Sequence, residues 1–396
     1  MDIFTNALQG NMKNDLRFFI LQEEGVMNLK PIVLLVIICF FFSCTGENGG
    51  RKATIDMENG IQVVRNPAEP HYGKDACIVT EYLSIGQKEG DPAYMFEKLF
   101  TVAVNHNEDI YVLDYQAKHI KMFNSEGSYI KTIGGPGQGP GEFEVPRRMT
   151  WSERDGLVIG DLNRVSYFDR DGHFLKSTPM RGMGIFDDVD NKGNIFITDI
   201  LMEEGFYEIK KFDPEFNFIC NLGKSPLQRT VQTGRRNPFF TLIRYDIING
   251  DEIVTGYAEE GYVLNLYDAA GNLVRKIGKD YTPLEISQED FEEWTADDPP
   301  ERKYKYYIPK HFPPFRTLQA DDEGRIWVYT WEKTQDRTQT YFDVFDKEGI
   351  FIAKIPLKSR PQVIKNNKIY TIEEDEEGFQ YVKRYSIEWN VKTGTE

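Results

Sequence analysis

Short apolar strands separated by polar turns recur along the chain from residue 78 to residue 390. The most regular unit is an aromatic residue, a turn of the form Asp/Asn-x-x-Gly and a short apolar run, as in residues 123–127 before SYIKTIG. Asp or Asn at the first turn position and Gly at the fourth suit a type I turn that needs a positive φ at its end. Each unit therefore predicts a β-hairpin. Further copies begin at Phe168, Phe212, Tyr267 and Phe345, and the copy at Phe212 carries Phe216 in place of Gly.

A second apolar run lies upstream of each hairpin and often ends in an acidic residue. The ends of successive runs are about 40 to 75 residues apart, and four-stranded propeller blades repeat every ~40–50 residues. The shorter spacings therefore indicate one blade each, and the longer ones a blade with an inserted loop. A leading strand, such as FTVAVN or RRMTWS, completes four strands per unit from hub to rim. The pattern predicts an all-β fold, a six-bladed β-propeller. The six runs are residues 110–114, 157–161, 195–199, 253–257, 326–330 and 369–373.

The last unit lacks an outer strand, because the chain ends after the strand that contains residues 381–387. Residues 78–86, IVTEYLSIG, have the pattern of an outer strand without a blade of their own. An open ring would leave two unpaired edges. We therefore expect residues 78–86 to complete the last blade by pairing with residues 381–387.

The N-terminal region has the pattern of an export signal. Residues 31–42 are all apolar, follow Lys30 and precede Ser43 and Cys44. The run is shorter than the ~18 residues that a spanning helix needs, and it fits the core of a signal peptide. Ser43 and Cys44 resemble the end of a bacterial lipobox, where the cysteine is acylated after cleavage, although Phe41 stands where the lipobox usually has Leu. An ordinary signal peptide with an incidental cysteine is the alternative.

These patterns divide the chain into three parts. Residues 1–43 are a dispensable upstream segment plus a lipoprotein signal peptide, with Met1 and Met27 as alternative starts. Residues 44–77 are a tether and lead-in, and residues 78–390 form the propeller, with an insertion at about 280–311. We expect a monomer outside the cytoplasm, in the cell envelope, that contacts a membrane through its lipid anchor only, with the outer membrane favoured.

The composition and net charge of the chain restrict the classes of molecule that it is expected to bind. The chain is 40% hydrophobic, 28% charged and 13% aromatic, which is typical of a globular protein rich in strands. The net charge of -16 would repel phosphate backbones, and no Lys/Arg-rich run offsets it. We therefore expect no nucleic-acid partner.

The cysteines and histidines indicate no metal or cofactor. Cys39 leaves with the signal peptide and Cys44 is lipidated, so Cys77 and Cys220 remain. The repeat register places these two on opposite sides of the ring, too far apart for a disulfide. We expect two free, buried thiols. The sequence has no CxxC motif, and its five histidines do not fall into ligand spacing.

One stretch carries a family resemblance. Residues 110–149, which include GGPGQGPGEF, resemble an NHL repeat, and weaker copies cover residues 78–390. Together with the lipobox, the chain is similar to the six-bladed propeller lipoproteins of Bacteroides-type bacteria, most of which have no assigned activity. A glycine-rich phosphate loop would need a helix behind it, whereas a strand follows here, so we interpret this segment as a connection between blades.

The longest insertions indicate a binding face. Residues 224–237, 280–311 and 332–339 occupy D-to-A or B-to-C connections, which emerge on the same face of a propeller. Aromatic groups beside polar ones suit a glycan, a peptide or a partner protein. The arginines on this face either converge on an anion or pair with nearby acidic residues. The candidate ligand-binding residues are Trp294, Tyr304, Tyr306, Tyr307, Trp331, Arg147, Arg148, Arg235, Arg236 and Arg316.

Two function classes stay open at this point. The first is a non-catalytic binding or interaction module of the cell envelope. The second is a hydrolase or lyase with polar residues that meet in the central channel, for which the sequence identifies no catalytic residue. We interpret the paired carboxylates at residues 187–188, 297–298 and 321–322 as solvated loop ends.

Overall fold

The computed structural model describes residues 52–73, 76–180, 182, 184–227 and 234–390. They belong to the second of two compact units, residues 50–396. The signal segment and Cys44 lie outside the described residues. Among the helices that are described, none is long and apolar enough to cross a membrane.

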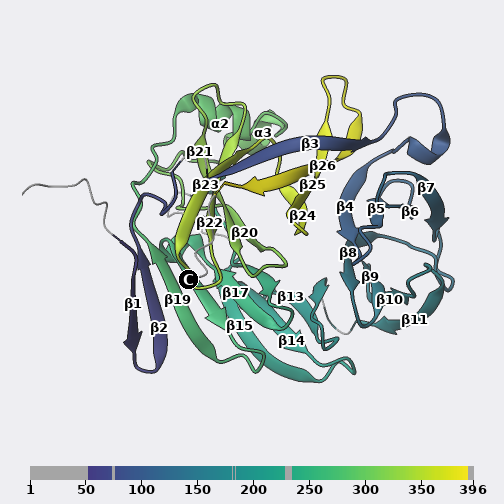
Figure 1. The fold of residues 1–396 in the computed structure, drawn as a ribbon, viewed down its shortest axis with the longest axis horizontal. Coiled ribbons are helices and arrows are strands. Elements are labelled where there is room, and N and C mark those ends of the chain that lie inside the picture. Colours follow the sequence, from purple (N-terminus) through teal and green to yellow (C-terminus); the bar gives the residue numbers. More distant parts are fainter. Residues whose placement is uncertain (1–51, 74–75, 181, 183, 228–233, 391–396) are drawn as a thin grey trace, which may run out of the picture. The chain divides into compact units, whose positions relative to one another are not determined.

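Six antiparallel blades of four strands make up the described unit (Figure 1), which confirms the predicted six-bladed β-propeller. Blade 1 consists of β4 (Leu99–Val104), β5 (Ile110–Asp114), β6 (His119–Phe123) and β7 (Tyr129–Ile133). Blade 2 consists of β8 (Pro146–Ser152), β9 (Gly156–Asp161), β10 (Arg164–Phe168) and β11 (Phe174–Pro179). Blade 3 consists of β12 (Ile185–Val189), β13 (Ile195–Leu201), β14 (Phe206–Phe212) and β15 (Phe218–Pro226). Blade 4 consists of β16 (Arg244–Ile248), β17 (Glu252–Gly256), β18 (Val263–Tyr267) and β19 (Leu273–Lys279). Blade 5 consists of β20 (Thr317–Ala320), β21 (Ile326–Lys333), β22 (Thr340–Phe345) and β23 (Phe351–Leu357). Blade 6 consists of β24 (Pro361–Lys365), β25 (Lys368–Glu374), β26 (Gln380–Trp389) and β3 (Cys77–Ile85). The first strand of each blade in this order is its inner strand, and we call these six strands, β4, β8, β12, β16, β20 and β24, the hub.

The ring closes as the sequence predicts. Strand β3 pairs antiparallel with β26, from Cys77 opposite Trp389 to Ile85 opposite Val382. In Figure 1 the purple β3 lies along the yellow β26, so early and late parts of the chain share one blade. Because β3 pairs with β26, β26 has a neighbouring strand on both sides, and the last blade is complete.

The recurrent turns have the expected local chemistry. The Oδ1 atom of Asp268 accepts hydrogen bonds from the backbone N–H groups of Ala270 and Asn272, at 3.0 and 2.8 Å. Gly271 at the end of this turn has φ +86°, which glycine adopts without steric cost. Phe216 occupies the corresponding place in blade 3 with φ +64°, so the turn keeps its shape although its glycine is missing.

A hairpin that the repeat pattern does not predict extends blade 4. Strands β1 (Thr54–Glu58) and β2 (Ile61–Asn66) form it, and β2 runs parallel to the outer strand β19, with Val64 opposite Ile277. The side chain of Asn66 donates to the carbonyl of Gly349 at 2.9 Å and accepts from the N–H of Phe351 at 2.8 Å. The lead-in is thus partly folded onto the propeller.

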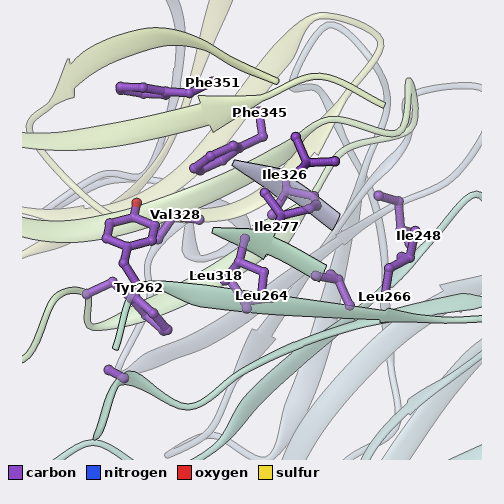
Figure 2. Packing of buried hydrophobic residues seen from close by; sticks show 14 residues of the cluster. Ile248, Tyr262, Leu264, Leu266, Ile277, Leu318, Ile326, Val328, Phe345 and Phe351 are labelled. Carbon is purple, nitrogen blue, oxygen red and sulfur yellow. The ribbon is translucent and has the colours of Figure 1, made fainter. Parts of the chain in front are cut away.

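The hydrophobic core lies between neighbouring blades. Figure 2 shows one cluster, in which Leu264 and Ile277 of blade 4 face Leu318 and Phe345 of blade 5. Each is at most 4% exposed. Burial of a side chain of this size contributes ~1.5–3 kcal/mol, so interblade packing provides the main stabilisation of the ring.

Both remaining cysteines are free, as expected, but they are half-buried rather than buried. Cys77 is on the closing strand β3 and Cys220 is on β15, in outer strands that retain partial contact with solvent. Burial raises the pKa of Cys77 to about 11, so its thiol stays protonated at neutral pH.

Candidate functional site

A cavity of about 170 Å³ lies where the hub strands of blades 4, 5 and 6 begin. We call it the mouth cavity. The connections between blades enter the hub at this end, which is the face that the insertions predict for a binding site. Its lining combines aromatic rings, two threonines and three arginines. The lining residues are Phe239, Phe240, Thr241, Arg244, Trp294, Arg316, Thr317, Tyr329, Trp331 and Arg360.

Aromatic rings hold Arg316 in place on one side of the mouth cavity. Its guanidinium carbon is 4.2 Å from the ring centroid of Tyr329, 4.7 Å from that of Trp331 and 4.9 Å from that of Trp294. The Nη1 atom of Arg316 also donates to the Tyr329 hydroxyl at 2.6 Å. Phe312 stacks on Trp331 with centroids 4.6 Å apart. Cation–π contacts and this hydrogen bond restrict the Arg316 rotamer, so the charge has a defined position.

Helix α2 (Gln288–Trp294) carries Trp294 to the cavity. Ser287 and Asp290 form a capping box that fixes the start of the helix. The Nε1 atom of Trp294 donates to the carbonyl of Pro238 at 3.0 Å. Arg337, in the loop between β21 and β22, pairs with Asp290 at 2.8 Å and with Glu293 at 2.9 Å. These contacts attach the helix to the B-to-C loop of blade 5.

The insertions also meet through their backbones. The N–H of Arg236 donates to the carbonyl of Lys305 at 2.7 Å, and the N–H of Tyr307 donates to the carbonyl of Arg236 at 3.1 Å. A second short helix, α3 (Pro300–Lys303), precedes this contact. The segment 280–311 thus contacts parts of both other predicted insertions.

Arg244 and Arg360 bring further positive charge into the cavity beside Arg316. The surrounding protein partly desolvates each guanidinium and thereby lowers its pKa, although Arg244 and Arg360 remain exposed to solvent. The charge of Arg360 lowers the pKa of Arg244 and of Arg316 further, and Arg148 lowers that of Arg244 and of Arg360. Within the described part of the chain, none of the three has a carboxylate oxygen within 4.0 Å, whereas Arg148 lies 3.7 Å from Asp187. The cavity therefore holds positive charge without a direct counter-ion from the protein.

Three carboxylates lie on the adjacent hub strands. Asp187 and Asp188 are on β12 and Asp246 is on β16. Burial raises the pKa of Asp188 to about 7, with a contribution from Asp246, and raises that of Asp246 to about 6. The register of β12 against β13 shifts between Phe186 and Asp188, as in a β-bulge that redirects a side chain.

The carboxylate pairs correct one interpretation from the sequence. Asp187 and Asp188 are in a hub strand, so they are not solvated loop ends. Asp321 is also buried. It accepts hydrogen bonds from Arg325 and from the indole of Trp327, so its role is structural. Periodicity missed these roles because acidic pairs are common in turns and only the tertiary fold buries them.

The predicted site residues divide into two groups. Trp294, Arg316 and Trp331 line the mouth cavity, and Arg148 is an electrostatic neighbour of Arg244 and Arg360. The others lie outside the cavity lining: Tyr304 is 81% exposed, Tyr306 donates to Asp298 at 3.0 Å, Tyr307 contacts Arg236 through the backbone, and Arg147 and Arg235 are exposed.

Sequence reasoning did not identify Arg244 or Arg360. A signal for both exists, because an arginine stands at or just before the first residue of the hub strand in blades 4, 5 and 6, at Arg244, Arg316 and Arg360. Superimposing the leading strands of the repeats, rather than the longest loops, would have found them.

Comparisons with known proteins agree with this architecture. A family model described as a 6-bladed beta-propeller, DUF5128, matches residues 96–184. The fold is a six-bladed β-propeller. Nothing among the curated proteins matches the chain. The six-bladed ring is similar to a candidate exported protein of Bacteroides fragilis NCTC 9343, with a TM-score of 0.51 and 13% identity over 82% of this chain and 99% of the other.

Two further structures resemble the propeller. A member of the DUF4221 family from Bacteroides vulgatus has a TM-score of 0.50 and 11% identity, covering 80% of this chain and 100% of the other. A gluconolactonase of Xanthomonas campestris has a TM-score of 0.41 and 12% identity, covering 73% of this chain and 86% of the other. At 13% and 11% identity, the likeness to the two Bacteroides structures shows the fold alone, and the chemistry has to be argued from the site.

Proposed function

We propose that this propeller is a non-catalytic binding module of the cell envelope that holds a ligand at the mouth cavity. One observation carries the proposal: the cavity lies at the hub, beneath insertions that are attached to one another, and combines aromatic walls with charged groups. Concave sites with a few convergent polar groups are typical of ligand binding. Glycans, peptides and partner proteins are the candidate ligands.

The size of the cavity limits what enters it. Small-molecule pockets commonly measure ~300–1,000 Å³, and the mouth cavity is smaller at about 170 Å³. It therefore suits the end of a ligand, such as one terminal sugar or side chain, while the remainder stays outside the cavity. This arrangement is compatible with recognition of a long molecule by its terminus.

Location outside the cytoplasm belongs to the same proposal. The likeness to a candidate exported protein supports it, as does the apolar run at residues 31–42. A lipid on Cys44 would keep the binding module at a membrane surface.

A hydrolase or lyase is the second candidate, and the observation in its favour is the pair Asp188 and Asp246. Carboxyl groups with a pKa of about 7 and about 6 have the values that general acids and bases need near neutral pH. Turnover of a bound ligand that disappears in Asp188→Asn would support catalysis. Binding without turnover would favour the module.

Titration calorimetry against a glycan and peptide panel tests the binding function. Trp294→Ala removes a ring that lines the cavity, and we expect it to weaken binding by ~10-fold or more. Tyr304→Ala is the matched control, since Tyr304 is an aromatic residue of the same insertion that does not line the cavity. Equal affinities in the two variants would place the binding site elsewhere.

A further inference from the structure

We propose that the mouth cavity binds a tetrahedral oxyanion, a sulfate or phosphate ester at the end of the ligand, between Arg244, Arg316 and Arg360. This inference rests on the proposed function, because it names the chemistry of the group that enters the cavity. It extends the sequence expectation, in which only Arg316 of these three was a candidate.

The three arginines reach the cavity from three consecutive blades. Arg244 is the first residue of β16, Arg316 immediately precedes β20 and Arg360 immediately precedes β24. All three line the same cavity of about 170 Å³. An arginine at or just before the start of the hub strand in each of three neighbouring blades brings three guanidinium groups to one small cavity.

The cluster lacks the counter-ions that other arginines in this protein have. Arg164, Arg325 and Arg337 each pair with an aspartate, at 3.1, 2.6 and 2.8 Å. In the ranges that the structure describes, Arg244 and Arg360 have no ion pair of this kind, although the protein has a net charge of -16. Arg244 and Arg360 are exposed to solvent and Arg316 is half-buried, so their like charges repel one another most strongly at low ionic strength, and a bound anion would remove that repulsion.

The carboxylates beside the cluster do not take the place of the anion. Asp246 is an electrostatic neighbour of Arg360, and Asp187 of Arg244. Asp246 instead accepts from the backbone N–H of Ala320 at 2.8 Å. Its raised pKa of about 6 shows that the site does not fully stabilise its negative charge.

Counting donors favours a tetrahedral anion over a carboxylate. Each guanidinium presents five N–H donors in a planar fork, and one fork is enough to satisfy both oxygens of a carboxylate. Three forks around one cavity match a group with three terminal oxygens and a charge of up to about -2, such as a sulfate or phosphate ester. Arg316 is positioned for this role by the rings of Tyr329 and Trp331.

Thermal unfolding with inorganic sulfate and phosphate tests the anion site directly. For the unsubstituted protein we expect a saturable rise in Tm of about 2–6 °C that sodium chloride of equal ionic strength does not produce. Arg360→Gln should abolish this rise. It should also have a higher Tm than the unsubstituted protein in low-salt buffer without anion, because the repulsion in the cluster is relieved. Arg147→Gln, an exposed arginine of the hub strand β8 outside the cavity, should leave both results unchanged.

Opposite results would overturn the anion site. Equal effects of chloride and sulfate would contradict it, and so would a lower Tm of Arg360→Gln in low salt, since these arginines would then stabilise the fold. Arg244→Gln is the second variant, and it should repeat the pattern of Arg360→Gln.

A second set of probes identifies the source of the anion and separates this inference from the proposed function. Calorimetry compares glucose 6-phosphate, glucose 6-sulfate, glucuronate and glucose. We expect one of the two esters to bind best, and Arg360→Gln to weaken that binding by ~10–100-fold. If glucuronate or glucose bound as tightly as the esters, and Trp294→Ala lost this binding, the oxyanion site would be contradicted. The proposed binding function would still be supported.

Discussion

At the scale of single residues, Lys211 and Asp190 show how a polar contact stabilises blade 3. Both side chains are 0% exposed, and the Lys211 Nζ lies 3.1 Å from the Asp190 Oδ2. The same ammonium donates to the carbonyl of Ala269 in blade 4 at 3.0 Å. Asp190 also accepts from the backbone N–H of Asn194 at 2.9 Å, so the pair connects the end of a hub strand to the next blade.

We expect Lys211→Met to lower the free energy of unfolding by ~3–5 kcal/mol, because it leaves Asp190 buried without its counter-ion. Urea denaturation measures the change. Lys210→Met is the matched control: Lys210 is partly exposed and pairs with Asp199 and Glu208, and its loss should cost ~1 kcal/mol or less because solvent screens these pairs. Similar losses in both variants would mean that burial does not set the strength of these pairs.

We expect Asp188 to make the stability of the protein depend on pH. The pKa of Asp188 is raised from the usual 3.8 to about 7, so between these values the folded protein binds a proton that the unfolded chain releases. The free energy of unfolding should therefore decrease as the pH rises through this window, by up to ~1.4 kcal/mol per pH unit. Thermal unfolding from pH 5 to pH 8 should show a shallower slope for Asp188→Asn, whereas the exposed Asp297→Asn should keep the original slope.

The candidate site was only partly predictable from single residues. Trp294, Arg316 and Trp331 were identified because they lie in or beside unusually long connections rich in aromatic residues. Tyr304 shares that composition and is exposed, so composition alone does not separate a lining residue from its neighbour. Arg360 lies in a short connection, and only the packing of blade 6 beside blade 5 brings it to the same cavity as Arg316.

At the scale of elements, the number of strands in each repeat predicted the closure of the ring, whereas a hairpin outside the repeats was missed. The missing outer strand of the last blade made β3 predictable, and its pairing with β26 is confirmed. The hairpin of β1 and β2 was missed, although Asn59-Gly60 is a strong hairpin signal and both residues have positive φ. Its strands lie outside the repeat, so the periodicity gave no reason to expect them.

The closing strand β3 allows a test of how far the ring depends on it. Ile85 is 2% exposed and packs in the core between blades 6 and 1, so Ile85→Ala should lower the free energy of unfolding by ~2–5 kcal/mol. Ile78 is on the same strand but is 52% exposed, and Ile78→Ala should cost ~0.5 kcal/mol or less. Chemical denaturation of the two variants measures both. If Ile85→Ala were as stable as Ile78→Ala, closure by β3 would contribute little to the stability.

At the scale of the whole molecule, the fold and the charge distribution have separate roles. The described unit is stabilised by contacts between neighbouring blades, which leave the hub ends free to carry polar groups. The chain has a net charge of -16, whereas the mouth cavity is lined by three arginines. The general field repels anions at long range, while the cavity attracts one at short range, so selection of the ligand depends on fit at the mouth and less on steering.

Attachment to a membrane is the remaining property of the whole molecule that the sequence predicts. The apolar residues 31–42 are too few to cross a bilayer, so stable attachment would require acyl chains on Cys44. In cells grown with a labelled fatty acid, we expect the protein to carry the label and to sediment with membranes. Cys44→Ser should lose the label and move to the soluble fraction, whereas Cys39→Ser, in the segment removed with the signal, should behave like the unsubstituted protein. Labelling that persists in Cys44→Ser would contradict a lipid at this residue, because a thioether-linked anchor needs the cysteine sulfur.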